Sequence, residues 1–407
     1  MIEWIAGQLG DFIELKRGYD LPSAQRQSGD VPIISSSGPA AFHNEAKVKA
    51  PGVVTGRYGT IGQVFYSTVD YWPLNTALYV RDFKGNDPRF TYYFLQTLDW
   101  HKFNDKSGVP GVNRNDAHQE PVALPSIAEQ RQIAAILGAL DDKIEVNRKT
   151  AATLEAMARA LYRSWFVDFD PVHAKAEGRQ PAHMDAATAA LFPDRFGDNG
   201  LPLGWESVPY LDRVEIVSGG TPKTSEPSYW GGDIPWYSVV DAPKSGDVFV
   251  HGTDKNITKE GFDNSAVKMV SRGTTIISAR GTVGKLAMAG RDMVFNQSCY
   301  GLRGLKPLND AFVYFATEYA VEHLQSMAHG SVFATITRKT FENLELTTAP
   351  NEVHVAYDQW ALQMLDRVHG LGRENATLTN LRDTLLPRLM SGELRVGAAE
   401  KIVSEAV

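Results

Sequence analysis

The stretch that decides the fold runs from Leu124 to Trp165 and reads LPSIAEQRQIAAILGALDDKIEVNRKTAATLEAMARALYRSW. After Pro125 it contains no further proline, and its apolar residues recur at alternating spacings of four and three. That spacing is typical of helices that pack along one another through an apolar seam. The seam consists of Ile133, Leu137, Leu140, Ile144, Asn147, Ala151, Leu154, Ala158, Leu161 and Trp165. We therefore predict one long helix that begins after Pro125.

A second helical stretch near the end of the chain repeats this pattern less regularly. Gly370 and Gly372 weaken the helix locally, and Arg382 occupies one seam position. Asn375 holds the place that Asn147 holds in the first seam, where a buried asparagine commonly fixes the register of paired helices. The seam residues are Ala361, Met364, Val368, Leu371, Asn375, Leu378, Leu385 and Leu389. The two seams predict an antiparallel coiled coil; the alternative is that each helix packs only on its own domain.

The chain also carries an internal repeat. WIAGQLGDFIELKRGYDLP, from Trp4, matches WESVPYLDRVEIVSGGTP, from Trp205, at an offset of about 201 residues. Further matches keep the same order along the chain: Gly59–Gly62 with Gly281–Gly284, Asn75 with Asn296, and Arg114 with Arg338. In both copies the part before the helix is rich in Gly, Pro and β-branched residues, which indicates short strands joined by turns. We expect two mixed α/β (α+β) modules, each followed by its own long helix.

The repeat and the helices divide the chain into six expected segments. They are a first module (1–124), a first helix (125–167), a connecting segment (168–203), a second module (204–349), a second helix (350–395) and a C-terminal tail (396–407). The connecting segment is rich in Asp, Pro, Ala and Gly. We expect it to be a surface connection with a short helix near Ala186–Leu191.

Composition limits the classes of protein to consider. A chain of 407 residues suits several structural units rather than one core. Its single cysteine, Cys299, excludes an intramolecular disulfide and a thiolate metal cluster. We find neither a signal peptide nor the roughly 20 apolar residues of a membrane helix, so a cytoplasmic protein is expected. The net charge of -7 is unusual for a protein that grips DNA alone, which suggests that a partner supplies part of the grip.

The motifs of catalysis are missing from the sequence. We find no phosphate loop, zinc motif, hydrolase nucleophile elbow or amino-methyltransferase loop. Asp30 followed by Glu45 and Lys47 matches the loose acidic pattern of metal-dependent nucleases, but the second copy keeps Asp233 without an acid-x-Lys triplet. We therefore interpret Asp30 and Asp233, each preceded by a glycine, as residues that form a turn. The chain is expected to be non-catalytic and to bind no metal or cofactor.

The repeated turns and helix starts supply the candidate DNA contacts. Arginine at the tip of a turn can bind a guanine edge or a phosphate, and polar residues at a helix start suit phosphate. Each of these side chains also has a plain structural alternative, such as an ion pair or a cap. The candidates are Ser36, Ser37, Arg57, Tyr58, Asn113, Arg114, Lys223, Tyr237, Ser238, Arg280, Arg338 and Lys339.

Four segments resemble a known family. Leu124–Ile133, Leu137–Ile144 and Ser164–Pro171 resemble the central helical region of the specificity subunits of type I restriction-modification enzymes. Leu385–Leu394 resembles their distal helical region, although Asn351-Glu-Val-His departs from the usual approach to that helix.

The resemblance implies a division of labour. Each module would be a target-recognition domain that reads one half of an asymmetric, bipartite DNA site. The paired helices would set the gap between the halves and dock two methyltransferase subunits, while a motor-nuclease subunit would supply translocation and cleavage. S-adenosylmethionine, ATP and Mg²⁺ would be bound by those partners. The residues expected to bind partners are Glu129, Gln130, Ile133, Leu137, Leu140, Ile144, Leu154, Leu161, Leu378, Leu385 and Leu389. The alternative is a tandem-domain adaptor that binds peptide or glycan.

Overall fold

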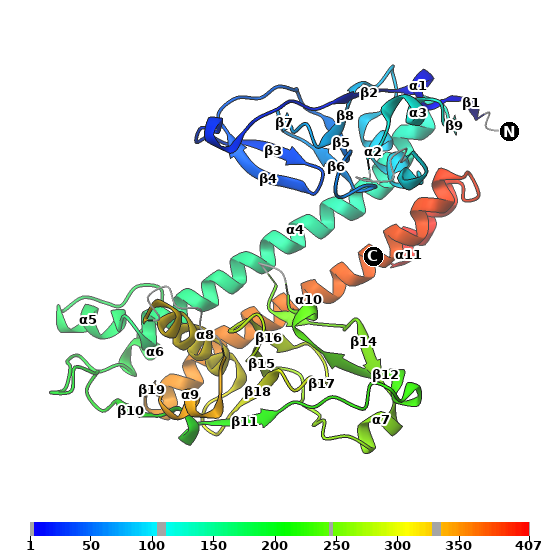
Figure 1. Ribbon diagram of the computed structural model, residues 1–407. Helices are drawn as coiled ribbons and strands as arrows, with labels where there is room; N and C mark the ends of the chain where they lie inside the picture. Colours follow the sequence, from blue (N-terminus) through cyan, green and yellow to red (C-terminus); the bar gives the residue numbers. More distant parts are fainter. Residues whose placement is uncertain (1–3, 104–110, 244–246, 328–334, 407) are drawn as a thin grey trace. The chain divides into compact units, whose positions relative to one another are not determined.

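The computed structural model describes residues 4–103, 111–243, 247–327 and 335–406 (Figure 1). Its internal contacts divide the chain into two compact units. Unit 1 comprises Met1–Ile144 together with Thr377–Val407, and unit 2 comprises Glu145–Ala376. None of the helices in the described ranges has the length and apolar character needed to cross a membrane.

Two helices of 40 residues each are the longest elements of the chain: α4 (Ile127–Phe166) and α10 (Asn351–Met390). They begin just after Pro125 and Pro350, because a proline disfavours helical backbone at the residue that precedes it. The two predicted helices are therefore confirmed. The N-terminal part of α4 and the C-terminal part of α10 belong to unit 1, and their remaining parts belong to unit 2.

Unit 1 is built on two small sheets and a two-stranded ladder. In the first sheet the strand order is β2 (Glu14–Arg17), β8 (Ala77–Asp82), β5 (Gly52–Gly56) and β6 (Val64–Ser67). In the second it is β4 (Gly38–His43), β3 (Val31–Ser35) and β7 (Trp72–Pro73), and the ladder joins β1 (Ile5–Gln8) to β9 (Pro121–Leu124). The helices that accompany them are α1 (Leu9–Phe12), α2 (Pro88–Gln96), α3 (Arg114–His118) and α11 (Val396–Ala406).

Unit 2 repeats this plan with one more strand. Its first sheet has the order β11 (Val214–Ser218), β18 (Cys299–Gly304), β15 (Thr275–Ser278), β16 (Leu286–Ala289) and β13 (Phe249–Val250). Its second has β14 (Lys255–Ile257), β12 (Trp230–Tyr237) and β17 (Val294–Phe295), and its ladder joins β10 (Glu206–Pro209) to β19 (Glu345–Thr348). The helices are α5 (Asp170–Ala176), α6 (Ala186–Ala190), α7 (Lys259–Asp263), α8 (Asp310–Met327) and α9 (Arg338–Glu342).

The two units share strand directions as well as strand order. In each second sheet one neighbour pairs antiparallel and the other pairs parallel: β3 with β4 and β7, and β12 with β14 and β17. The outer ladders are antiparallel in both units. The mixed α/β architecture and the duplication that the sequence predicts are thus present in the fold.

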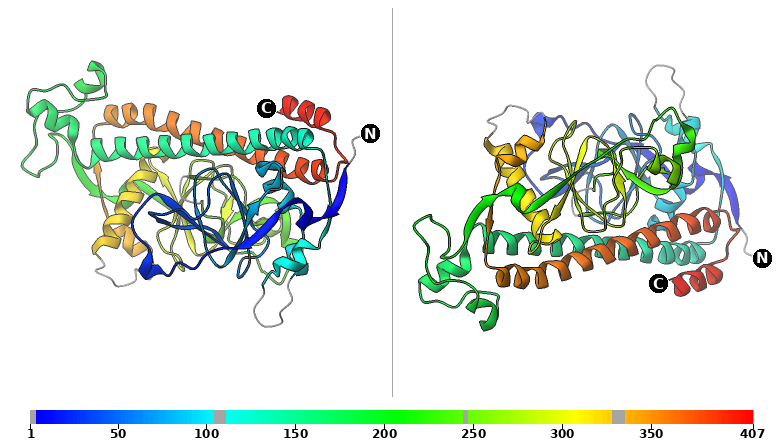
Figure 2. Two further views of the ribbon diagram at one scale, coloured as in Figure 1. Left: turned by 90° about the horizontal axis from the view of Figure 1, so that it is seen from above. Right: turned by 90° about the horizontal axis from the view of Figure 1, so that it is seen from below.

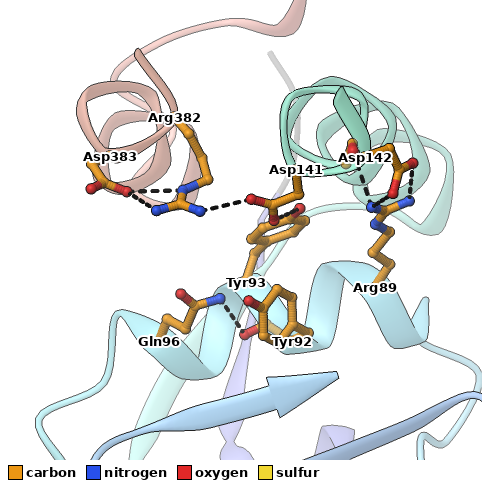
Figure 3. Close-up of polar contacts among 9 residues, drawn as sticks. Arg89, Tyr92, Tyr93, Gln96, Asp141, Asp142, Arg382 and Asp383 are labelled. Atoms are coloured by element: carbon orange, nitrogen blue, oxygen red, sulfur yellow. Dashed lines mark hydrogen bonds and ion pairs between the residues drawn. The ribbon is translucent and has the colours of Figure 1, made fainter. Parts of the chain in front are cut away.

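In unit 1, the N-terminal part of α4 packs beside the C-terminal part of α10 (Figure 2). Leu137 and Leu385, both almost completely buried, belong to the same apolar core. Arg382, which interrupts the seam, forms an ion pair of 2.7 Å with Asp141, and the Tyr93 hydroxyl donates a 2.5 Å hydrogen bond to the same carboxylate (Figure 3). The positive charge of Arg382 is therefore neutralised by Asp141 of α4, and Tyr93 of α2 donates a further hydrogen bond to that carboxylate.

In unit 2, the other halves of the same helices meet. The Asn147 side-chain amide donates a hydrogen bond of 3.0 Å to the Asn375 side-chain oxygen. Further along, Trp165 and Phe166 of α4 contact Tyr357 of α10, with ring centroids 6.1 and 5.3 Å apart. Because the later residues of α4 meet the earlier residues of α10, the two segments run antiparallel.

The paired asparagines yield a test of register. Asn147 is 2% exposed, so replacing Asn375 with alanine leaves a buried amide without its partner. We expect Asn375→Ala to lower the free energy of unfolding by about 1–3 kcal/mol. Changing both residues to leucine is expected to restore stability, because no polar group is then left unpaired. Chemical denaturation of the three chains measures this, and a double variant less stable than the single one would contradict it.

Two segments differ from the sequence-based expectation. Residues 396–407 were expected to be a tail, yet Val396–Ala406 form helix α11, whose Ala399 is completely buried in the core of unit 1. The connecting segment contains helix α5 besides the short helix expected near Ala186, which is α6. Its Phe192 is 2% exposed and lies edge-on to Trp165, so part of this segment belongs to the core.

The two glycines of α10 do not interrupt the helix. Residues 351–390 remain helical through Gly370 and Gly372. A Cβ at Gly372 would collide with the imidazole of His251, whereas one at Gly370 would meet nothing within 4 Å. Gly372 therefore allows His251, which follows β13, to pack closely against the helix, whereas Gly370 has no such contact within 4 Å.

Candidate nucleic-acid interface

A basic cavity of about 590 Å³ lies in unit 1. It is lined by the end of β2, the turn after β5, part of β8 and the start of α3. Its polar lining includes Lys16, Arg17, Arg57, Tyr58, Asn113 and Arg114. No carboxylate is among the described residues that line it. The structure therefore gathers four of the sequence-predicted residues at one cation-rich hollow.

The backbone around Arg57 is held on both sides. The amides of Arg57 and Tyr58 donate to the carbonyl oxygen of Thr76 at 2.9 and 3.0 Å. The amide of Val112 donates to the Arg57 carbonyl oxygen at 2.9 Å. The Arg57 guanidinium lies 4.4 Å from the centroid of the Tyr58 ring, a distance at which the ring face attracts the cation. Arg57 is thus fixed by its main chain and supported by an aromatic side chain.

Glycines make this turn possible. A Cβ on Gly56 would collide with the carbonyl oxygen of Thr60, so only glycine fits there. Gly59 has a φ of +78°, which side chains rarely adopt. In the turn after β5, the backbone at Gly56 therefore lies close to the backbone at Thr60. The next two residues, Arg57 and Tyr58, carry the side chains that line the cavity. Both side chains are half-buried, rather than at the exposed tip that the sequence suggested.

The neighbouring turn of the second sheet joins this arrangement. The Ser36 amide donates to Thr76 Oγ1 at 3.4 Å, so Thr76 connects the β3–β4 turn to the Arg57 turn. The hydroxyls of Ser37 and Ser35 are 3.1 Å apart. Ser36 and Ser37 are accordingly engaged in turn structure next to the basic cavity.

The start of α3 supplies the third part of the cavity. The Asn113 side chain accepts a hydrogen bond of 3.0 Å from the Asn115 amide, which makes it the N-cap of the helix. Arg114 is exposed at the first helical position. Capping explains Asn113 by itself, so Arg114 is the stronger candidate for contact with a ligand.

Sequence reasoning missed two basic residues of the cavity, Lys16 and Arg17. Lys16 lies 5.4 Å from the Tyr19 ring centroid, and Arg17 forms an exposed ion pair of 3.2 Å with Asp20. The signal was the Lys-Arg pair immediately before Gly18, one of the repeat's anchor glycines. It was overlooked because basic residues at a strand end are common.

Unit 2 has the same turn with different side chains. The Ala279 amide donates to the Ser298 carbonyl at 2.7 Å, and the Ile336 amide donates to the Ala279 carbonyl at 2.9 Å. Gly281 repeats the φ of +78°. By these hydrogen bonds Ala279 is the counterpart of Arg57, and Arg280, which is exposed, is the counterpart of Tyr58.

The remaining candidates of unit 2 fall into two groups. Lys223 and Lys339 are exposed, and Arg338, also exposed, has Glu342 at 3.8 Å. Ser238 is engaged locally, because its hydroxyl donates to Asp241 at 3.0 Å. The structure does not bring these residues together in one cavity with Arg280 as it does in unit 1; they stay predictions.

The prediction that Tyr237 contacts DNA disagrees with the structure. Its side chain is completely buried in an apolar cluster, and burial raises the pKa of its hydroxyl. The last three residues of β12 are all buried, so the Tyr237 side chain is inaccessible to DNA in this structure.

Comparison with known proteins places this geometry in a family. Residues 1–156 and 202–370 match the model of the type I restriction modification DNA specificity domain. The chain belongs to this family. The match covers both copies of the repeat and most of the chain.

Individual relatives agree with the family match. The chain is 26% identical to the type I restriction enzyme HindI specificity subunit of Haemophilus influenzae, over 75% of this chain and 77% of that protein. It is also 26% identical to the MjaIX specificity subunit of Methanocaldococcus jannaschii, over 36% of this chain and 34% of that one. The crystal structure of the type I S subunit from M. genitalium superposes with a TM-score of 0.62 at 13% identity, over 95% of this chain and 96% of that chain. The fold is therefore shared with a specificity subunit.

The residues expected to bind partner subunits are used within this family member's own units. Gln130 accepts a hydrogen bond from the Asp87 amide at 3.0 Å and donates to Asn86 at 2.8 Å, so it joins α4 to the start of α2. The others are buried or half-buried in the cores: Glu129, Ile133, Leu137, Leu140, Ile144, Leu378, Leu385 and Leu389 in unit 1, and Leu154 and Leu161 in unit 2. The spacing of apolar residues along a helix is the same whether the helix packs on a partner or on another helix of its own chain. Here these residues pack within the chain itself.

The acidic pattern set aside in the sequence analysis is also accounted for. Lys47 forms an ion pair of 2.5 Å with Glu45 and lies 4.7 Å from the Trp72 ring centroid. Within the described ranges no group of three or more His, Cys, Asp or Glu side chains is arranged to hold a metal ion. The Glu45-Ala-Lys47 triplet is therefore explained as a local ion pair.

A buried acid in unit 2 affects stability rather than the interface. Burial, aided by the nearby charge of Asp310, raises the pKa of Asp358 to about 7, and its Oδ1 atom has no hydrogen-bond partner among the described residues. Because this folded-state pKa lies above the unfolded value of 3.8, the folded state is favoured at low pH and loses stability as pH rises through 7.

We expect Asp358→Asn to stabilise the protein more at pH 8 than at pH 5, by roughly 2 kcal/mol. The amide has the same shape and no charge to bury. Denaturant titrations of both chains at the two pH values measure the difference. An equal gain at both pH values would show that the charge of Asp358 is not the cause.

Proposed function

We propose that this chain is the DNA-recognition subunit of a type I restriction-modification complex. The observation that carries the proposal is the cation-lined cavity of unit 1, built by Arg57 and Arg114 on loops that the second unit repeats. Basic side chains and main-chain amides supply the phosphate and base contacts of DNA-binding proteins. Membership of the DNA specificity domain family supports the same function.

Each unit would read one half of a bipartite, asymmetric site. The shared turn supports two reading surfaces of one design, and the exchange of Arg57 for Ala279 supports different sequences in the two halves. The long helices α4 and α10 would act as a spacer for the unread gap. Each has 40 residues, which corresponds to about 60 Å of helix.

The chemistry would belong to partner subunits. Two methyltransferase subunits would dock on the helices, bind S-adenosylmethionine and methylate adenine after base flipping. Motor-nuclease subunits would use ATP and Mg²⁺ for translocation and cleavage. This chain would select the site in the cytoplasm, catalyse nothing and bind no cofactor. The net charge of -7 supports a shared grip on DNA, since partner subunits would contribute phosphate contacts.

The basic cavity also separates this function from the adaptor alternative. A cavity lined by several cations suits a polyanion, whereas pockets for small uncharged ligands are lined mainly by apolar and aromatic side chains with a few polar groups. We therefore retain DNA as the ligand.

The test is to map methylated adenines in cells that express this chain with its methyltransferase subunit, against cells that lack this chain. A bipartite motif that appears only with this chain is expected. If the complex assembles, the methyltransferase works with another specificity subunit, and no new motif appears, the proposal fails.

A module exchange tests the independence of the two reading units. Replacing Ala6–Val122 with the equivalent part of another family member is expected to change one half of the methylated motif. The junctions lie almost opposite each other on the β1–β9 ladder, where Ala6 pairs with Ala123 and Gly7 with Val122. The methylated motif of the exchanged chain is the measurement. Alteration of both halves would contradict independent reading.

A further inference from the structure

The first reading unit contains an arginine whose main chain is hydrogen-bonded on both sides and whose guanidinium lies over an aromatic ring. Both main-chain amides around Arg57 are tied to Thr76, its carbonyl is tied to Val112, and its guanidinium rests 4.4 Å from the Tyr58 ring centroid. Arg17, by contrast, is paired with Asp20 on the surface. A side chain whose orientation is fixed before binding loses little entropy when it meets its ligand.

Rigid presentation of a guanidinium favours a directional contact. Phosphate can be approached from many directions and tolerates a mobile cation, whereas the edge of a base requires a planar fork in one orientation. The guanidinium fork matches the O6 and N7 acceptors that guanine displays in the major groove. The Tyr58 ring attracts the guanidinium that lies 4.4 Å from its centroid, and a lysine in its place would lack the planar fork.

The comparison of the two units sharpens the distinction. Two of the three main-chain hydrogen bonds around Arg57 recur at Ala279 in unit 2, from its amide to Ser298 and from Ile336 to its carbonyl oxygen, but alanine carries no guanidinium. Arg280 stands one position later and is exposed on the turn, as the counterpart of Tyr58. A phosphate contact needs only a cation, which can stand at different positions in the two units, whereas a contact to a base edge needs a guanidinium at one position. The exchange of Arg57 for alanine fits a contact of the second kind.

We propose that Arg57 is a specificity-determining residue that reads a guanine in the half-site of unit 1, and that Tyr58 is the residue that positions it. This inference rests on the proposed function and adds the contact between Arg57 and one base of the DNA site. Lys16 and Arg114, which line the same cavity, supply the phosphate contacts around that guanine. Arg280 supplies a phosphate contact in unit 2.

The experiment maps methylated adenines for the assembled complex carrying Arg57→Lys, Arg57→Ala, Tyr58→Phe or Tyr58→Ala. Both Arg57 variants are expected to lose the requirement for one guanine in one half of the motif. Tyr58→Ala is expected to relax the same position in part, and Tyr58→Phe, which keeps the ring, to retain it. Arg280→Ala is the matched variant in unit 2, and we expect weaker methylation at all sites with the motif unchanged.

Binding measurements give a second readout. Fluorescence anisotropy with the cognate duplex and with a duplex changed at that one base pair measures discrimination directly. We expect Arg57→Lys to reduce discrimination by about 5- to 150-fold, as for loss of one bidentate arginine–guanine contact. The thermal unfolding temperature of each variant identifies any loss of folding, and the half-buried position of Arg57 makes such a loss small.

The outcomes separate the two proposals. If the wild-type complex yields no motif, the proposed function is wrong. If it yields a motif that stays unchanged with Arg57→Lys and Arg57→Ala, while methylation falls alike at every site, Arg57 contacts phosphate and the inference is overturned. If the motif changes in the half that does not respond to exchange of Ala6–Val122, the assignment of Arg57 to its half-site is overturned.

Discussion

Replacing Phe166 with alanine is expected to lower the free energy of unfolding of unit 2 by about 4 kcal/mol. The ring is 2% exposed and lies at the end of α4. It contacts Trp205, Phe312 and Tyr357, with centroids 5.7, 4.9 and 5.3 Å away. The substitution removes this ring from these three pairs and from its pairs with Tyr162, Trp165 and His354, and it leaves a cavity that the large side chains around it cannot easily close.

Hydrogen–deuterium exchange of peptides from residues 145–376 measures this change unit by unit. Val240→Ala is the control, because Val240 is 77% exposed and its loss should alter stability by no more than about 0.5 kcal/mol. Phe166→Leu should fall between the two, since it retains part of the apolar volume. Similar protection in the Phe166→Ala and Val240→Ala chains would refute the central role of this ring.

Replacing Gly56 with alanine is expected to damage the proposed DNA-binding surface and the fold of unit 1 together. The added Cβ would collide with the Thr60 carbonyl oxygen, and a main-chain atom cannot move aside as a flexible side chain can. We expect a loss of at least about 2 kcal/mol in the free energy of unfolding. Because Arg57 follows directly in the chain, its guanidinium is displaced from the cavity, and DNA binding should weaken.

Gly370→Ala is a matched substitution with the opposite expected sign. It lies within α10, and its Cβ would meet nothing within 4 Å, so alanine should stabilise the helix by up to about 1 kcal/mol. Denaturation and DNA-binding curves of both variants make the comparison. A Gly56→Ala chain that retains wild-type stability and affinity would show that the turn can open without cost.

The helices and the duplication were readable from the sequence because both depend on spacing. The four-and-three pattern survives in α4 and α10, and the paired Asn147 and Asn375 follow from their places in it. The sheets were less accessible. Strand order depends on partners far apart in the chain, such as Ile33 beside Trp72 in a parallel pair, and no local signal specifies them.

Some residues of the basic cavity could be predicted from the sequence, and others could not. Arg57 and Arg114 stand next to repeat anchors, and the fold brings both into one cavity. Tyr237 stood at an equally promising anchor, but the strand directs it into the core. Which face a strand residue takes depends on the layer that covers it, and no local signal in the sequence specifies that layer.

The division of the two helices between units has a consequence for how the protein is made. Unit 2 is one continuous stretch, Glu145–Ala376, whereas unit 1 needs residues from both ends of the chain. Leu378 and Leu389 are almost completely buried in the core of unit 1. At translation rates of about 5–20 residues per second, tens of seconds pass between synthesis of the first module and synthesis of these residues. The unit that leaves the ribosome first is therefore completed last, and a nascent chain interrupted after Ala376 carries a whole unit 2 beside a first module with an uncovered apolar face.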